Sequence, residues 1–177
     1  MSIVLRRIDE RLIHGQVVIG WGHQLRPDCF VLVDDELADS DWEKQLYELA
    51  AGRSEVIFAS VDDARDRLAE WGTSDRRVIL LTRDIGTMRR LAEGGLLSGE
   101  EVNLGGIHHG PGRKELLPYL YVTQKDREGL RTIAAEGVEL SARDLPDAHR
   151  VSLSTLLKDG SNECRQIFFA SAYSVDS

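Results

Sequence analysis

Short apolar runs alternate along the chain with longer segments whose apolar residues recur at helical spacing. The clearest run covers residues 29–33, where every side chain is apolar, as in strands buried on both faces of a parallel sheet. Glycine or proline ends most of the helical segments. The pattern predicts strands at residues 3–8, 29–33, 55–60, 77–82, 102–104, 116–123 and 138–142, and helices at residues 16–25, 39–50, 61–72, 84–91 and 125–136.

Strands and helices alternate almost without exception in this prediction. Such alternation favours an α/β fold with a single doubly wound, mostly parallel sheet that carries helices on both faces. Pro118 confines the strand at 116–123 to a sheet edge or a strand start, because proline cannot donate a ladder hydrogen bond. In such sheets ligands bind beyond the carboxyl ends of the strands, so the loops at that edge are the first candidates for a site.

The loop after the first predicted strand carries a cluster of polar side chains around His14. A neutral imidazole can accept a phosphoryl group near neutral pH if an acceptor holds its other ring nitrogen. Asp9, or a backbone carbonyl of the turn, could be that acceptor. Arg7 and Arg11 offer guanidinium groups that match the charge and shape of phosphate. We therefore expect a phosphohistidine at His14, with Asp9 and Arg11 in catalysis. Arg7 would bind the phosphate.

The two residues after His14 complete the expected anion site. Gly15 lacks a Cβ, so backbone N–H groups could approach phosphate oxygens. The helix predicted from Gln16 directs its positive end toward the same place, which adds about 0.3–1 kcal/mol. Each charge-assisted hydrogen bond contributes roughly 1.5–3 kcal/mol, so the arginines should outweigh the helix end. The simpler alternative is that His14 is a capping or core residue.

Residues 7–17, Arg-Ile-Asp-Glu-Arg-Leu-Ile-His-Gly-Gln-Val, also resemble a known motif. They are similar to the phosphohistidine motif of the IIB components in the mannose/fructose/sorbose family of bacterial sugar phosphotransferase systems (PTS). Weaker similarity continues in the same order to about residue 150. It includes residues 33–35 with Ala38, residues 103–106, and residues 137–140 with Arg143 and Pro146.

The resemblance implies a phosphocarrier with defined partners. His14 would take a phosphoryl group from a phosphohistidine on a IIA protein and pass it to a sugar held by the membrane-embedded IIC and IID subunits. The protein would then be cytoplasmic and associated with the membrane through those subunits. No cofactor or metal is expected, because arginine neutralises the phosphate charge. The identity of the sugar and the oligomeric state, including a homodimer, stay open.

Loops that follow other predicted strands could frame a pocket around His14. Asp34 and Asp35 follow the second strand, where they could position the histidine, hold a metal, or simply favour a helix start. A glycine-rich loop follows the fifth strand and could cradle an anion or contact the partner's phosphohistidine; its candidate residues are Gly105, Gly106, His108, His109 and Lys114. The two histidines lack a convincing third zinc ligand, so no metal site is predicted.

Composition narrows the range of functions. A net charge of −8 and a pI near 5.1 argue against nucleic acid as a partner. No apolar run approaches the roughly 20 residues of a membrane span, and residues 1–6 do not resemble a signal peptide. Cys29 and Cys164 lie far apart, as is typical of free thiols in a reducing compartment.

The length favours one domain, which we expect to be a IIB-like phosphocarrier domain at residues 1–150. Residues 151–177 would form a C-terminal extension with a short helix at 152–157. Its apolar and aromatic stretch at 165–170 would pack on the same domain or self-associate, because exposed phenylalanines are unfavourable in water.

Two other functions remain open from the sequence. The chain could be a regulatory phosphohistidine protein without a role in transport. It could also be a non-catalytic module that binds an anion or a sugar phosphate reversibly through its arginines.

Overall fold

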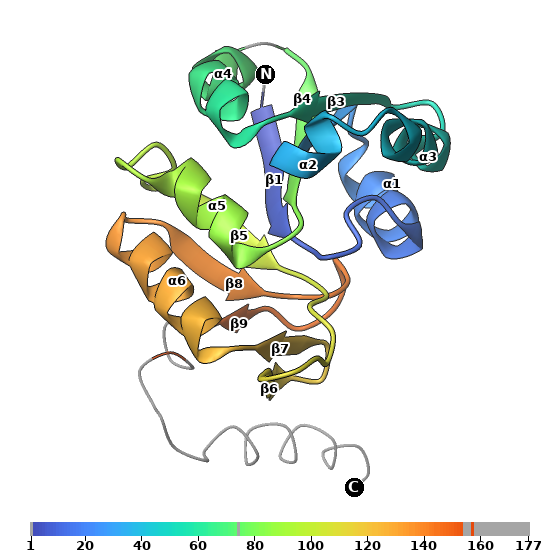
Figure 1. The fold of residues 1–177 in the computed structure, drawn as a ribbon. Coiled ribbons are helices and arrows are strands. Elements are labelled where there is room, and N and C mark those ends of the chain that lie inside the picture. Colours follow the sequence, from blue (N-terminus) through green and yellow to red (C-terminus); the bar gives the residue numbers. More distant parts are fainter. Residues whose placement is uncertain (1, 74, 154–156, 158–177) are drawn as a thin grey trace, which may run out of the picture.

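A mostly parallel sheet of seven strands forms the centre of the computed structural model, which describes residues 2–73, 75–153 and 157 (Figure 1). The strand order is β3-β2-β4-β1-β5-β8-β9, and only the pair β8–β9 is antiparallel. The strands are β1 (Ser2–Ile8), β2 (Cys29–Val33), β3 (Glu55–Ala59), β4 (Arg77–Thr82), β5 (Glu101–Leu104), β8 (Glu139–Ala142) and β9 (Val151–Ser152).

Helices cover both faces of the sheet (Figure 1). One face packs against the π-helix η1 (Gln16–Trp21), α1 (Gly22–Leu25), α2 (Asp35–Ala38) and α3 (Asp41–Ala51). The other face packs against α4 (Val61–Thr73), α5 (Ile85–Ala92) and α6 (Gln124–Ala135). The predicted doubly wound α/β fold is therefore confirmed.

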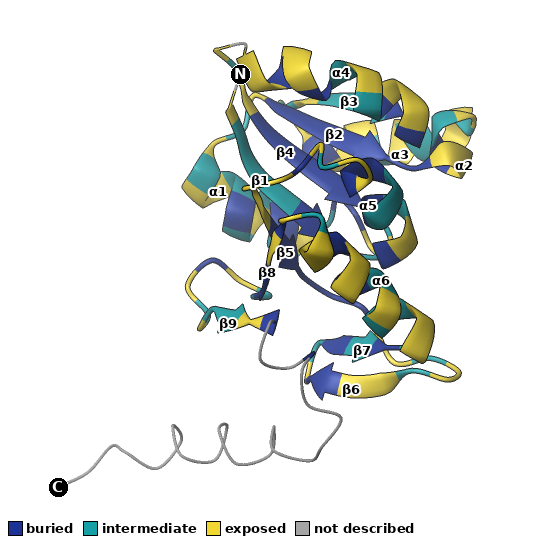
Figure 2. Ribbon diagram, turned by 90° about the vertical axis from the view of Figure 1, so that its left-hand side faces the viewer, coloured by how far each residue is buried: buried dark blue, intermediate teal, exposed yellow. Residues whose placement is uncertain are grey.

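The burial of β2 explains why all five of its residues are apolar. Phe30 and Leu32 belong to the hydrophobic core on the η1 and α3 side, whereas Val31 and Val33 belong to the core on the α4 and α5 side. Both faces of the strand are thus removed from water, and β2 is buried along its whole length (Figure 2). Burial on both faces leaves no position for a polar side chain.

Polar side chains cap several helices at the carboxyl edge of the sheet. Asp34 accepts a hydrogen bond from a backbone N–H at the start of α2, and Asp84 does the same for α5. Thr123 and Asp126 form a reciprocal capping box at the start of α6. The helix α1 ends differently: its C-cap residue Arg26 adopts a left-handed conformation with φ 48°, and Pro27 follows it.

The prediction of one strand at 116–123 is wrong. The segment instead forms a hairpin of two short antiparallel strands, β6 (Lys114–Leu117) and β7 (Leu120–Val122), outside the main sheet. Pro118 and Tyr119 form the turn, where proline needs no ladder hydrogen bond. Ile107 attaches the hairpin to the chain after β5, because its backbone bonds with those of Tyr119 and Tyr121 at 3.0 and 2.9 Å.

The chain continues to pack on the sheet just beyond residue 150. β9 pairs with β8, and the side chains of Leu153 and Leu157 are buried. The apolar stretch at 165–170 lies outside the described residues, so the division into residues 1–150 and 151–177 stays a prediction. None of the helices in the described ranges is both long and apolar enough to cross a membrane.

Candidate functional site

The loop after β1 leaves the sheet at a topological switch point. The chain passes from β1 to η1 on one face, whereas the helix after the neighbouring strand β4 lies on the other face. Asp9 starts the loop with a hydrogen bond from its backbone N–H to the Thr82 carbonyl at 3.0 Å. Leu12 is buried with φ 52°, an uncommon value for a non-glycine residue. This tight turn brings His14 back over the carboxyl end of β1.

The His14 imidazole is held by the turn itself. Its Nδ1 lies 3.0 Å from the Leu12 carbonyl oxygen and 3.9 Å from Asp9 Oδ1. A carbonyl only accepts hydrogen bonds, so Nδ1 carries the proton of the neutral ring. Nε2 is buried and has no hydrogen-bond partner among the described residues. The sequence left open whether Asp9 or a backbone carbonyl would accept the hydrogen bond from the ring. The Leu12 carbonyl accepts it, and the Asp9 carboxylate, 3.9 Å from Nδ1, lies beyond hydrogen-bond distance.

Arg7 is fully buried behind Asp9. Its Nε and Nη2 donate to Asp9 Oδ2 at 3.2 and 2.9 Å, and Nη1 donates to Asn103 Oδ1 at 2.6 Å. The carbonyls of Arg143 and Asp144 accept further bonds at 2.8 and 3.1 Å. Burial lowers the pKa of Arg7 from its ordinary value, and the Asp9 carboxylate opposes this shift. Its donors are directed at protein groups, so this geometry does not suit the direct phosphate contact expected from the sequence.

Gly105 and Gly106 allow the β5 loop to approach this ion pair. A Cβ on Gly105 would lie 2.1 Å from Arg7 Nη2, so a larger residue cannot fit beside the guanidinium. The backbone N–H of Gly106 donates to Asp9 Oδ2 at 3.2 Å. On the other side, the backbone N–H of Arg11 donates to Asp9 Oδ1 at 3.2 Å. The Asp9 carboxylate thus joins the β1 loop to the β5 loop.

Arg11, Gly15 and Gln16 line the open side of the loop. The Arg11 side chain is 43% exposed, with Nε 3.9 Å from Asp9 Oδ1 and Nη2 donating to Gln16 Oε1 at 2.9 Å. Gly15 has helical dihedral angles, and no atom lies within 4 Å of the position a Cβ would take. The space beside Gly15 is therefore open, and the partly exposed Arg11 guanidinium is bonded to the next residue, Gln16.

Asp34 and Asp35 have partners of their own at the same sheet edge. Asp34 caps α2 and accepts from Arg83 Nε at 2.9 Å. Asp35 accepts from the backbone N–H of Val61 at 2.8 Å and pairs with Arg90. The hydrogen bond from Val61 and the pairing with Arg90 both lower the pKa of Asp35. The structure shows no contact between either aspartate and His14.

The Glu10 side chain was not singled out from the sequence, yet it joins two loops of the site. Its Oε1 pairs with His108 Nδ1, and its Oε2 accepts from Arg113 Nη1 at 3.0 Å. Burial alone would raise the pKa of Glu10, but the hydrogen bonds from His108 and Arg113 outweigh it and hold the pKa below its ordinary value. These partners lie about a hundred residues away in the chain, so no local sequence pattern indicates them.

His109 and Lys114, the other two polar candidates of the glycine-rich loop, are exposed and bond to none of the residues around His14 in the described part of the chain. His109 is exposed and contacts the Tyr121 ring edge-on, with centroids 5.7 Å apart. Lys114 is exposed at the start of β6. Among the described residues, no group of three or more histidine, cysteine, aspartate or glutamate side chains is arranged to hold a metal ion.

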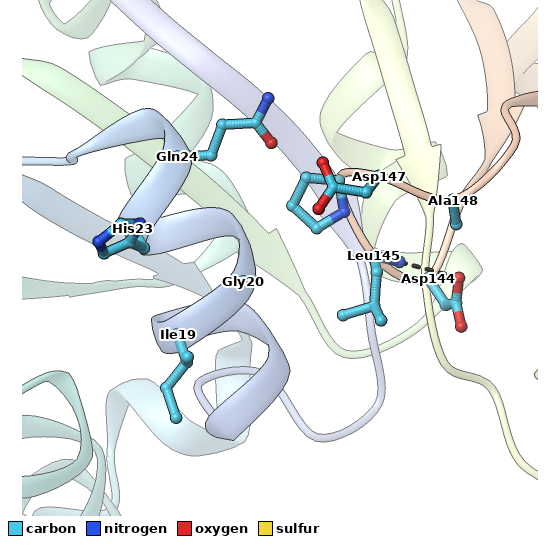
Figure 3. A pocket seen from close by; sticks show the side chains of 9 residues that line it. Ile19, Gly20, His23, Gln24, Asp144, Leu145, Asp147 and Ala148 are labelled. Carbon is cyan, nitrogen blue, oxygen red and sulfur yellow. Dashed lines mark hydrogen bonds between the residues drawn. The ribbon is translucent and has the colours of Figure 1, made fainter.

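A separate pocket of about 630 Å³ lies between η1, α1 and the loop after β8 (Figure 3). It contains none of the residues predicted for the site. Trp21 supports its rear wall, because its indole N–H donates to the Asp144 carbonyl at 3.2 Å and the Arg143 guanidinium lies 4.8 Å from the ring centroid. The residues that line the pocket are Ile19, Gly20, His23, Gln24, Asp144, Leu145, Pro146, Asp147 and Ala148.

Comparison with known proteins assigns this fold, with its histidine at the carboxyl edge of the sheet, to the phosphotransferase system components. Residues 3–166 match the family model described as "PTS system sorbose subfamily IIB component". The chain therefore belongs to the sorbose subfamily of PTS IIB components. This match confirms the family that the motif around His14 predicts.

Relatives of several sugar specificities share this similarity. The chain is 31% identical over 147 residues to the N-acetylgalactosamine-specific phosphotransferase enzyme IIB component 1 of Escherichia coli K12, covering 82% of this chain and 92% of that protein. It is 30% identical over 160 residues to the mannose-specific EIIAB component of the same strain, covering 89% of this chain but 49% of that protein.

Solved structures agree with the assignment. The crystal structure of manxB from Thermoanaerobacter tengcongensis superposes with a TM-score of 0.78 and 30% identity, covering 91% of this chain and 98% of that one. The crystal structure of the Escherichia coli N-acetylgalactosamine-specific IIB component 1 gives a TM-score of 0.76 and 30% identity, covering 84% and 97%.

Proposed function

We propose that this IIB component carries a phosphoryl group on His14. It accepts the group from a phosphohistidine of a IIA protein and passes it to a sugar during uptake through IIC and IID. The observation that carries the proposal is the His14 ring itself, which is fixed by the Leu12 carbonyl beside the buried Asp9 and the exposed Arg11. The chain would act in the cytoplasm, at the membrane face where those subunits lie.

The proposal divides the charged groups into two sets. Arg11, with the open space beside Gly15, would contact the phosphoryl oxygens, because its guanidinium is exposed. Asp9 and Arg7 would act behind the histidine, where their fixed charges hold the loop and the ring in place. Arg7 is therefore proposed as a positioning residue and not as a phosphate ligand.

The transfer breaks the P–N bond of the donor phosphohistidine and forms a P–N bond to His14, whose ring proton passes to the released donor imidazole. The second step breaks the His14 P–N bond and forms a P–O bond to a sugar hydroxyl, whose proton returns to the His14 ring. A ring nitrogen must offer its lone pair to phosphorus in the first step. In this conformation Nδ1 is engaged with Leu12 and Nε2 is covered. The ring must therefore leave this hydrogen bond or turn before it accepts phosphate.

Phosphorylation with defined components tests the proposal. The pure protein is incubated with phosphoenolpyruvate, the general phosphotransferase proteins and a IIA protein, and acid-labile phosphate is mapped. We expect one labelled residue, His14, and complete loss of label in His14→Ala. His23→Ala is the matched control, since His23 is exposed on α1 and should not affect labelling.

The remaining outcomes separate the alternative functions. No acid-labile phosphate on the wild-type protein would contradict the proposal and favour a binding module. Label on His14 without sugar phosphorylation, in membranes that contain IIC and IID, would favour a regulatory phosphohistidine protein. Isolating the phosphohistidine and identifying its isomer by NMR would show which ring nitrogen becomes available.

A further inference from the structure

Glu10 connects the phosphohistidine loop to the loop after β5 by three bonds. Its backbone N–H donates to the Gly106 carbonyl at 3.0 Å, and its carboxylate binds the side chains of His108 and Arg113. Arg113 also donates to the His108 carbonyl at 2.7 Å, which closes the loop on itself. Among the described residues, the hydrogen bonds that join residues 108–113 to the His14 loop all end on Glu10.

This connection places His108 at the rim of the candidate site. The point where Gly106 would carry a Cβ lies 3.5 Å from Arg11 Nη2, 3.6 Å from Asp9 Oδ1 and 3.7 Å from His108 Cε1. Three polar groups therefore converge over one glycine. The His108 side chain is 53% exposed and is therefore accessible to a partner protein.

Residues 107 and 109 of this loop are anchored to the β6–β7 hairpin. Ile107 is fixed by its backbone bonds to the β6–β7 hairpin, and His109 contacts Tyr121 of β7. Neither anchor determines where the His108 ring and the Arg113 guanidinium lie relative to the His14 loop. The Glu10 carboxylate does, because one of its oxygens is bonded to the His108 ring and the other to the Arg113 guanidinium.

We propose that Glu10 is a positioning residue that holds the His108–Arg113 loop against the His14 loop, so that His108 and Arg11 form a preformed polar rim for the incoming phosphohistidine of the donor protein. The inference rests on the proposed function of His14. A rim that is already fixed lowers the entropy lost when the donor docks. Releasing the rim should therefore weaken docking of the donor more than it slows phosphoryl transfer. Asp9, Arg11 and His14 keep their own contacts when Glu10 is changed.

Steady-state phosphorylation of the full chain by a phosphorylated IIA donor tests this inference. Glu10→Gln removes the charge but keeps the shape of the side chain. We expect the KM for the donor to rise about fivefold, the size expected from loss of a partly exposed ion pair. The kcat should stay within about twofold, because groups at the reacting atoms are unchanged.

A double-mutant cycle shows whether Glu10 acts through its partners. Arg113→Met should raise the KM in the same way, and Glu10→Gln combined with Arg113→Met should be little worse than either single variant. His108→Gln should also raise the KM. Its matched control is His109→Gln, whose neighbouring imidazole makes no bond to Glu10. Glu36→Gln is the charge control, since Glu36 is exposed on α2 and forms no ion pair within the described ranges.

Hydrogen exchange gives a readout that does not depend on phosphorylation. The amides of residues 108–113 should exchange faster in Glu10→Gln than in the wild-type protein, and at the wild-type rate in Glu36→Gln. Unchanged KM together with unchanged exchange would overturn the inference, and so would a fall in kcat with constant KM. If the wild-type protein takes no label at all, the proposed function fails and the docking role fails with it; the exchange result then still decides whether Glu10 holds the loop.

Discussion

At the scale of single residues, the site depends on a buried ion pair more than on surface charge. Arg7 and Asp9 are both fully removed from solvent, and Arg7 Nη2 lies 2.9 Å from Asp9 Oδ2. Such a pair adds little net stability against an apolar equivalent, but removing one partner leaves an uncompensated buried charge. The loop that carries His14 therefore tolerates changes at Arg7 poorly, although Arg7 does not reach the open side of the site.

Arg7→Met removes the guanidinium and keeps most of the side-chain length. We expect the free energy of unfolding to fall by about 3–5 kcal/mol, because the Asp9 carboxylate loses its buried partner. Urea denaturation measures this change. Arg53→Met, at an exposed arginine without an ion pair among the described residues, should stay within about 0.5 kcal/mol of the wild-type protein. Similar losses in both variants would contradict the role of the buried pair.

Gly105→Ala should disturb the same pair from the opposite side. The new methyl group would lie 2.1 Å from Arg7 Nη2, so the buried guanidinium would have to move. We expect a loss of about 1–3 kcal/mol in the free energy of unfolding, as for other overpacked interiors. Gly15→Ala is the control: it has open space and helical angles, and alanine there should be neutral or stabilising by up to about 1 kcal/mol. Equal stability of Gly105→Ala and wild type would refute the steric argument.

The lowered pKa of Glu10 predicts a dependence of stability on pH. Its ordinary value is 4.5, and its folded-state pKa is lower, so the unfolded chain takes up the proton first on acidification. The Glu10 interactions therefore stabilise the fold fully above pH 4.5, and this contribution is lost as the pH falls through the folded-state pKa. Glu10→Gln should flatten the fall in unfolding free energy between about pH 5 and pH 3. Urea denaturation over this range measures it, and an unchanged slope would contradict the prediction.

At the scale of elements, the sequence predicts best those segments whose local chemistry and burial agree. The strands at 29–33 and 77–82 have the predicted bounds because they are buried on both faces. The helix at the carboxyl side of β7 begins within one residue of its prediction, where Thr123 and Asp126 cap it. The strand predicted at 116–123 is wrong because an apolar run does not reveal the turn at Pro118. The short α2 and β9 lack any periodicity to indicate them.

Thr123→Ala tests how much the capping box contributes to α6. The threonine hydroxyl accepts from the Asp126 N–H at 3.0 Å, and its loss should cost about 1 kcal/mol in the free energy of unfolding. Thr132→Ala is the control, because its hydroxyl only donates back to the Glu128 carbonyl within the helix. That variant should be neutral or slightly stabilising in the same urea experiment. A larger loss in Thr132→Ala than in Thr123→Ala would contradict the assignment.

At the scale of the whole molecule, the sequence indicates which residue types form the candidate site better than it indicates where their side chains point. The spacing of Arg7, Asp9 and His14 is visible in the chain, and topology explains why the Gly105 loop meets them. The inward direction of Arg7 cannot be read from the sequence, because it depends on acceptors supplied by Asn103 and by the loop after β8. The bond between Glu10 and His108 likewise requires the assembled sheet.

The position of β1 has a mechanical consequence. This strand pairs with β4 along its length and with β5 at its last two residues, Arg7 and Ile8, so freeing its carboxyl end requires two ladders to break at once. The amides at this end of β1 should be among the slowest in the chain to exchange with solvent. We therefore expect motion next to His14 to be confined to side chains, because the strand that carries its loop is held on both edges at the end where the loop begins.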